Sequence, residues 1–224
     1  MFTFPIAHFG TVTPIEITYT DEYSTETNAS SYSFSQDYGT ADADRYVIVG
    51  VFGFNSSGTR TVSSVTIGGE AATELASVQT SSNLSVYALY GAYVTTGTSG
   101  TVVATFNGTV DRFACVTYTV LGLKSTTPVD SDSANTTTTT PTSSVLVKAG
   151  GGIISICGVE SSGGTSFAWD QLDEDVDSSA IAAIANSYYS GASKVFATGR
   201  ASQTVSLTQS NSTARQALLT LSMR

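Results

Sequence analysis

The sequence has little histidine, little cysteine and few charged residues. Its single histidine, His8, stands near the start of the chain, and no GxSxG motif occurs, so a Ser-His-Asp hydrolase would lack both its base and its usual nucleophile turn. The two cysteines, Cys115 and Cys157, lie in apolar stretches far from each other in the sequence. We expect two buried, reduced thiols, and neither a zinc site nor a cysteine nucleophile. We therefore predict that the protein is not an enzyme.

Charge is scarce and mostly negative. Nine basic and eighteen acidic residues give a formal charge of −9, and the basic residues are scattered singly, so phosphate-rich partners would be repelled. No stretch reaches the roughly 18 apolar residues that cross a bilayer. The opening residues 1–14 lack a basic start and contain two prolines, unlike a secretory signal. We expect no nucleic-acid partner, no membrane insertion and synthesis without export.

Thr, Ser, Val, Tyr and Phe are abundant instead. β-Branched and aromatic residues favour pleated strands, whereas long surface helices need Glu, Lys, Gln and Ala. Apolar or alternating runs bounded by turn residues recur at RYVIVGVFGF (45–54), LSVYALYGAYV (84–94), GTVVATFNG (100–108), DRFACVTYTVLGL (111–123) and VLVKAGGGIISICGV (145–159). The sequence therefore predicts an all-β fold.

The pair Gly68-Gly69 in TVSSVTIGGEAATELA fits either a β-hairpin or a phosphate-binding loop. A phosphate loop places glycine amides at the start of a helix and commonly continues with Lys and Ser or Thr. Here no lysine follows, and Glu70 would put a carboxylate where the phosphate belongs. A Gly-Gly turn between strands needs only tolerance of positive φ, so we predict a hairpin.

The second part of the chain repeats signals of the first. GFNSSG (53–58) matches GVESSG (158–163), Ile48, Val49 and Val51 align with Ile153, Ile154 and Ile156, and RFACVTYTVL (112–121) aligns with RQALLTLSMR (215–224). Each half would be marginal alone, so we predict one two-sheet antiparallel β-sandwich, jelly-roll-like, over residues 41–224. Its two similar halves, about 45–123 and 150–224, are joined by the Thr-rich loop 124–149. Two tandem domains are the alternative.

Residues 1–40 carry alternating polar and aromatic residues but no long apolar run. We predict an N-terminal arm that attaches the protein to a neighbour. A strand that returns to the chain's own sheet is the alternative.

The densest acidic cluster is WDQLDEDVD, residues 169–177. Asp173, Asp175 and Asp177 have the alternate spacing of the first ligands in a calcium loop. The cluster is not an EF-hand, because Ser178 and Ile184 replace its glycine and its bidentate glutamate. A looser calcium site at these three residues, with a weaker one at residues 130–132, stands beside the plainer interpretation of a solvated acidic loop. No other cofactor is expected.

Aromatic residues near this cluster are candidates for sugar binding. Trp169, Tyr188 and Tyr189 could stack on a sugar while nearby Asp and Ser side chains take its hydroxyls, although tyrosines in strands more often fill a core. Tyr87, Tyr90 and Tyr93 belong to a second tyrosine-rich stretch. Paired carboxylates among Glu70, Glu74 and Glu160 would be the remaining generic enzyme option. We expect these three to be solvated acids instead.

The order of these signals resembles a known class of domains. A strand ends in a turn with SSG, and VSSVTIGGEAATELA, LSVYALYGAYV, GTVVATFNG, RFACVTYTVLGL and TTPVDSDSA follow. This order is similar to β-sandwich domains of tailed-bacteriophage virion proteins and of some bacterial surface proteins, over about residues 45–224. The resemblance implies a structural part of a phage particle, a capsid decoration or cement protein or a head fibre, bound to other virion proteins and oligomeric or shell-bound. The alternative is a tail-associated receptor-binding or carbohydrate-binding module that meets a host surface glycan.

Overall fold

The structure, a computed structural model, describes residues 12–80, 84–161, 165–178, 186–211 and 215–224. In these ranges the regular elements are almost all strands, β1 to β17, and every strand pairing is antiparallel. No helix within the described ranges is long and apolar enough to cross a membrane. The predicted all-β, antiparallel sandwich character is confirmed.

The first half of the chain forms two sheets. Sheet A has the order β1 (Glu16–Thr25), β9 (Arg112–Leu121), β3 (Tyr46–Phe54), β7 (Val86–Tyr93), β6 (Thr73–Gln79). Sheet B has the order β2 (Ala29–Asp37), β8 (Ser99–Val110), β4 (Val62–Ile67), β5 (Glu70–Ala71). The turn between β4 and β5 is Gly68-Gly69, with φ of 62° and 90°. The predicted hairpin at this glycine pair is confirmed.

The second half repeats the same order. Sheet C runs β10 (Asp130–Asn135), β17 (Arg215–Met223), β12 (Gly152–Glu160), β15 (Ser187–Val195), β14 (Asp173–Asp177). Sheet D runs β11 (Thr142–Val147), β16 (Arg200–Gln209), β13 (Phe167–Asp170). Strand for strand, sheet C matches sheet A and sheet D matches sheet B, except that β5 has no counterpart among the described strands. The repeat seen in the sequence is therefore a repeat of topology.

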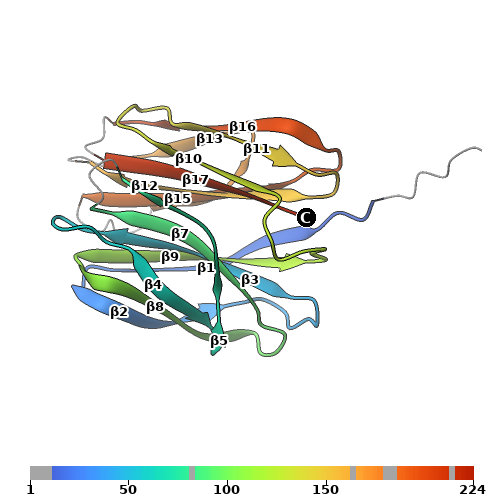
Figure 1. Cartoon of the computed structure of the whole chain (residues 1–224), viewed down its shortest axis with the longest axis horizontal. Coiled ribbons are helices and arrows are strands. Elements are labelled where there is room, and N and C mark those ends of the chain that lie inside the picture. Colours follow the sequence, from blue (N-terminus) through green and yellow to red (C-terminus); the bar gives the residue numbers. More distant parts are fainter. Residues whose placement is uncertain (1–11, 81–83, 162–164, 179–185, 212–214) are drawn as a thin grey trace, which may run out of the picture.

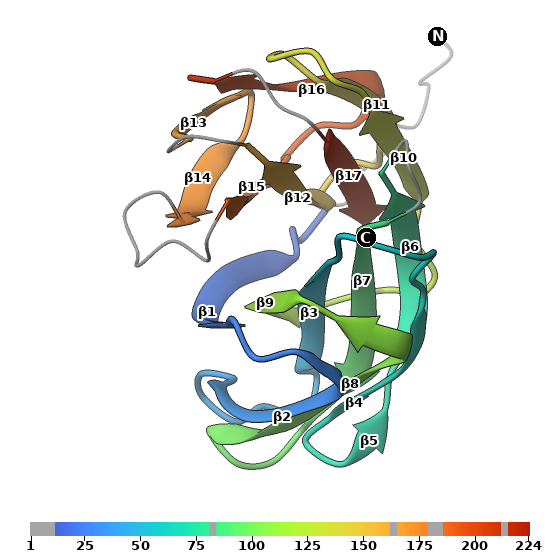
Figure 2. The same ribbon diagram turned by 90° about the vertical axis from the view of Figure 1, so that its left-hand side faces the viewer.

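The four sheets stack in the order B, A, C, D, with the second half above the first in Figure 1 and the layers seen from the side in Figure 2. Strand alternation builds this stack. On β3, Val49 and Val51 pack toward sheet B, whereas Ile48 and Phe52 pack toward sheet C. Central strands of sheets A and C are thus buried on both faces, which explains their continuous apolar runs.

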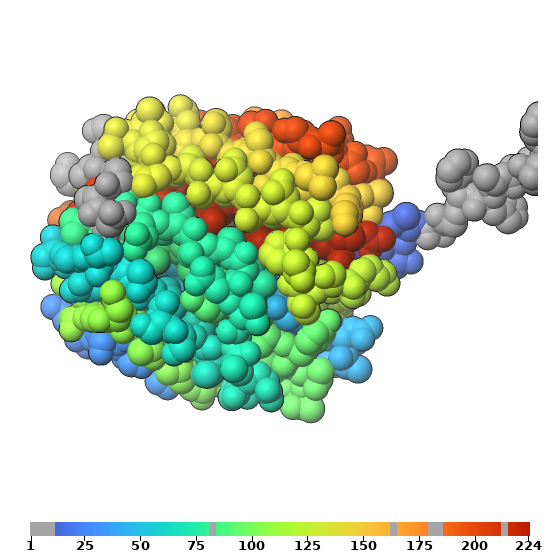
Figure 3. Space-filling model, in the orientation of Figure 1, coloured from blue at the N-terminus to red at the C-terminus, as the bar shows by residue number. Residues whose placement is uncertain are grey.

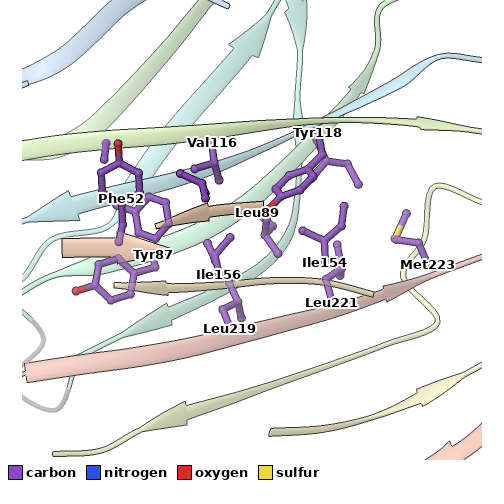
Figure 4. Close-up of a cluster of buried hydrophobic side chains, with 14 of the residues drawn as sticks. Phe52, Tyr87, Leu89, Val116, Tyr118, Ile154, Ile156, Leu219, Leu221 and Met223 are labelled. Atoms are coloured by element: carbon purple, nitrogen blue, oxygen red, sulfur yellow. The ribbon is translucent and has the colours of Figure 1, made fainter. Parts of the chain in front are cut away.

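The two halves share one core between sheets A and C. Figure 4 shows Phe52, Tyr87 and Tyr118 of the first half facing Ile156 and Leu219 of the second. In the space-filling view the halves adjoin as one body (Figure 3). Both halves thus lie in one continuous structure, although each half forms its own pair of sheets.

The prediction of a forty-residue N-terminal arm is wrong for the residues that the structure describes. Residues 16–25 pair with β9 and residues 29–37 with β8. Their alternate side chains join the core: the rings of Tyr23 and Phe34 stack at 4.6 Å, and those of Tyr32 and Phe113 at 4.4 Å. The alternative, strands that return to the chain's own sheets, is what the structure contains. Residues 1–11 lie outside the described residues.

The Thr-rich stretch predicted as a loop contains strands β10 and β11. They are the counterparts of β1 and β2, so the repeats span residues 16–121 and 130–223. Asp130 and Asp132 on β10 accept hydrogen bonds from the backbone N–H groups of Leu146 and Ser144 on β11, at 2.7 and 2.8 Å. These carboxylates tie sheet C to sheet D, which gives residues 130–132 a structural role.

Candidate functional site

The two cysteines and the three aromatic residues considered for sugar binding are buried or half-buried. Cys115 and Cys157 are free, fully buried thiols, as predicted, and burial raises the pKa of both. Tyr188 is 7% and Tyr189 1% exposed. Trp169 packs between sheets C and D, and its indole N–H donates to the Ser190 hydroxyl at 2.8 Å. For Tyr188 and Tyr189 the alternative holds, because strand alternation turns their rings into the core. Trp169 is half-buried and its indole N–H is already bonded, so the sugar-binding interpretation gains no support here.

The two outer carboxylates of the acidic cluster, Asp173 and Asp177, lie on β14 and have separate partners on other strands. Asp173 is exposed and pairs with Lys194 at 3.4 Å. Asp177 accepts a hydrogen bond from the backbone N–H of Phe167 at 3.2 Å. Within the described ranges, no group of three His, Cys, Asp or Glu side chains is arranged to hold a metal ion. The calcium interpretation gains no support from the structure.

Asp175 differs from its neighbours because it sits in a β-bulge between Glu174 and Val176. It lies close to Tyr118 and Ser193, and burial raises the pKa of its carboxyl. One carboxylate oxygen of Asp175 and the hydroxyl of Tyr118 are buried without a hydrogen-bond partner. This pair places a polar contact at the edge of the apolar core between sheets A and C.

Glu70, Glu74 and Glu160 do not come together. Glu74 accepts hydrogen bonds from the hydroxyls of Tyr90 and Ser77, both at 2.6 Å. Glu160 is buried and takes its own partners, an ion pair with Arg215 and the Ser85 hydroxyl. Glu70 stands on β5, at the rim of a separate cleft. No pair of these carboxylates is placed to act on one bond.

The cleft beside Glu70 has an unused set of binding groups. We name it the tyrosine cleft. Its volume is about 270 Å³, and its lining comprises Ala71 and Ala92 together with Tyr46, Glu70, Thr73, Gly91, Tyr93 and Thr126. Strands β3, β5, β6 and β7 supply most of its wall. The connection after β9 supplies the rest.

Two tyrosine rings form one wall of the tyrosine cleft. Tyr46 and Tyr93 face each other across β3 and β7, with ring centroids 5.0 Å apart in an edge-to-face arrangement. Gly91 is needed there, because a Cβ at this position would clash with the Tyr46 ring. Burial, and then the neighbouring Tyr93, raises the pKa of Tyr46 to about 12, so the Tyr46 hydroxyl is protonated at neutral pH.

The polar groups of the tyrosine cleft are not consumed by the fold. Within the described part of the chain, the hydroxyls of Tyr46 and Tyr93, the Glu70 carboxylate and the Thr73 and Thr126 hydroxyls make no hydrogen bond. A second cleft of about 420 Å³, between β4 and β6, differs. Its Glu74 is bound to Tyr90 and Ser77, and its Gln79 side chain donates to the Arg60 carbonyl. The tyrosine cleft is therefore the better candidate site.

The sequence alone does not reveal this cleft, although Tyr93 and Glu70 each stand out in it. The clue is the end of β7, where Tyr87 and Tyr90 are buried but Tyr93 is 47% exposed. The exposure of Tyr93 depends on how far the neighbouring strands extend, and that is a property of the assembled sheet.

Comparison with models of known protein families finds no match, and comparison with curated proteins finds no detectable relative.

Proposed function

We propose that this chain is a non-enzymatic structural protein of a tailed-bacteriophage particle, a capsid decoration or cement protein or a head-fibre protein. The order of sequence signals supports this proposal through its resemblance to virion β-sandwich domains. The observation that carries it is the build of the molecule: a four-layer stack of paired strands whose polar outer faces hold few charges. Such a stack is stiff, because nearly all of its backbone groups are bonded within sheets.

The two outer faces of the stack are alike. On β2, Ser31, Ser33 and Ser35 are exposed while the residues between them are buried, and on β11 Thr142 and Ser144 are exposed in the same way. Cross-strand hydroxyl pairs continue these rows, Ser31 with Thr105 at 3.1 Å and Ser144 with Thr204 at 3.0 Å. Contacts made through uncharged hydroxyls depend little on salt, which suits a protein that must stay attached outside a cell.

Attachment through a forty-residue arm is not part of this proposal, since residues 16–37 are built into sheets A and B. The partners are other virion proteins, and they contact the surface of the folded body. The protein is expected in the particle, as a shell-bound or oligomeric component. An enzyme role receives no support from the candidates that the sequence offered, since Cys115 and Cys157 are buried and Glu70, Glu74 and Glu160 do not come together.

The test is the copy number of this chain in purified particles from the source, measured by quantitative mass spectrometry against the major shell protein. Hundreds of copies would support shell decoration. A few to some tens would support a head or vertex fibre and would also fit a tail location. Absence from particles that carry the other virion proteins would overturn the proposal.

A further inference from the structure

We propose that the tyrosine cleft binds one neutral pyranose ring of a glycan, with Tyr93 as the stacking platform and Glu70 as the acceptor for a pair of sugar hydroxyls. This inference does not rest on the virion role, because it is drawn from the cleft alone.

The tyrosine cleft presents an exposed aromatic ring. Tyr93 is 47% exposed, and the other large apolar side chains exposed within the described ranges are Val12 and Leu146. Tyr93 is thus the one aromatic residue that the described surface leaves open, and it stands in a concave place rather than on a flat face. Tyr46, only 2% exposed, fixes its orientation from below. The apolar face of a pyranose fits such a rigid ring.

The tyrosine cleft also presents hydrogen-bonding groups suited to a sugar. A sugar ring presents several hydroxyls that each both donate and accept, so its site needs acceptors and donors within a few ångströms of an aromatic face. The tyrosine cleft offers the Glu70 carboxylate as an acceptor and the Thr73 and Thr126 hydroxyls as either. None of these side chains has a partner within the described structure. Unbonded groups gathered around an open ring are what a ligand of this kind requires.

Charge and size restrict the sugar. No Lys or Arg is among the residues that line the cleft, and Glu70 adds a negative charge to a chain of formal charge −9. Acidic sugars and phosphate esters would therefore be repelled. A volume of about 270 Å³ is below the usual range for drug-sized ligands, so the cleft itself encloses no more than about one sugar ring.

The described part of the second half has no such site at the corresponding strand positions. Strand pairing places Gly152 and Val195 at the positions of Tyr46 and Tyr93. A Cβ at Gly152 would clash with Ile17, so this position is packed against β1. The repeat of topology therefore does not produce the cleft. The tyrosine pair is an addition that only the first half carries.

The experiment is saturation-transfer difference NMR and calorimetric titration of the full chain with the methyl glycosides of glucose, galactose, mannose and N-acetylglucosamine. Glucuronic acid is the acidic comparison. We expect at least one neutral glycoside to bind saturably, with a Kd of about 1 to 10 mM as befits a single ring. Glucuronic acid should bind at least tenfold more weakly. The absence of saturable binding by all four neutral glycosides would overturn the inference.

Three variants assign the binding to the cleft. Tyr93→Ala and Glu70→Gln should each weaken binding at least tenfold, whereas Leu146→Ala, which removes an exposed apolar side chain from sheet D, should leave it unchanged. Thermal unfolding of each variant checks that it is folded. Equal affinity of Tyr93→Ala and the parent chain would also overturn the inference. Because copy number in particles does not enter this experiment, its failure and that of the virion proposal are distinguishable.

Discussion

The two halves of this molecule share a strand order but differ at the interface between them. Phe52 pairs with Ala114 and Tyr87, and its counterpart Gly158 pairs with Ala217 and Tyr189. Across the interface Phe52 contacts Tyr189, at 5.2 Å between ring centroids, while Gly158 lies against Tyr87. The same pair of positions thus meets twice, as in a two-fold symmetric dimer. In one contact the first residue is a phenylalanine, and in the other it is a glycine without a side chain.

The centre of this interface shows why the halves must differ. Gly50 and Ile156 occupy corresponding positions and meet each other: a Cβ on Gly50 would lie 3.2 Å from a methyl group of Ile156. Two large side chains cannot fill one place on a symmetry axis. One half therefore supplies the side chain and the other supplies the space. The repeated topology builds the sheets, and the unequal residues make one half fit only the other.

The largest expected loss of stability follows from removing the Phe52 side chain from the interface between the halves. Phe52→Ala empties a fully buried site between Tyr87 and Tyr189. We expect a loss of about 3 to 5 kcal/mol in the free energy of unfolding, since the cavity cost adds to the lost burial. Chemical denaturation followed by tyrosine fluorescence measures it. A loss below about 1 kcal/mol would show that the interface does not hold the halves together.

Adding a side chain at Gly158 should lower the free energy of unfolding by less. Gly158→Ala would drive a methyl group into the Tyr87 ring, and we expect a loss of about 1 to 3 kcal/mol from overpacking. Gly108→Ala is the matched control, because Gly108 lies in β8 and a Cβ there would only touch the Arg60 side chain at 3.4 Å. Thermal denaturation should separate the two variants. Equal unfolding temperatures for both would contradict the unequal interface.

The edges of the interface also differ between the halves. Asp175 sits in the bulge of β14, and Leu75 sits in the corresponding bulge of β6. Tyr118, beside Asp175, corresponds to Leu221 in the second half. One edge is therefore apolar, while the other holds a buried carboxyl and a phenol. Glu22 lies on the same polar edge, where it accepts a hydrogen bond from Tyr189 at 3.1 Å.

This polar edge should make stability depend on pH. Burial raises the pKa of Asp175, Glu22 and Glu174 above that of an unfolded carboxyl, which is about 4. The protonated forms therefore favour the folded state, so this contribution is complete below pH of about 4 and is lost as the pH rises through the raised values. Asp175→Leu should stabilise the protein by roughly 1 kcal/mol at pH 7 and flatten the dependence. Unfolding temperatures at several pH values measure this, with Leu75→Asp at the corresponding bulge as the comparison. If the unfolding temperature of Asp175→Leu depended on pH as steeply as that of the parent chain, the prediction would be contradicted.

Whether a strand can be recognised from the sequence depends on how much of it is buried. Strands β3, β9 and β12 are buried along nearly their whole length, so their apolar runs identify them. Strand β10 has no fully buried residue, and backbone pairing with β17 holds it instead, so its polar sequence looks like a loop. The same applies to β1, none of whose side chains is fully buried.

Register is the second limit. Matching the two SSG turns aligns Ile48 with Ile153, but Ile48 and Ile154 are the residues that face the shared core. Because side chains alternate along a strand, a shift of one residue exchanges the two faces. The same alternation buries the rings of Tyr188 and Tyr189 and leaves Trp169 half-buried, although the sequence alone allows all three at the surface. Which face of each strand is covered becomes clear only when the four sheets are stacked.

The smallest expected effect lies beside the polar edge. Lys194 and Asp173 form an ion pair at 3.4 Å, with side chains 39% and 77% exposed. Because water screens both charges, Lys194→Ala should change the free energy of unfolding by less than about 0.5 kcal/mol. Any such change should shrink further in about 1 M salt, where the screening length is only about 3 Å. Denaturation at low and high salt measures it. A salt-independent loss above about 1 kcal/mol would show that Lys194 also offsets the neighbouring carboxyls, and that the polar edge is held together by charge and not by protonation.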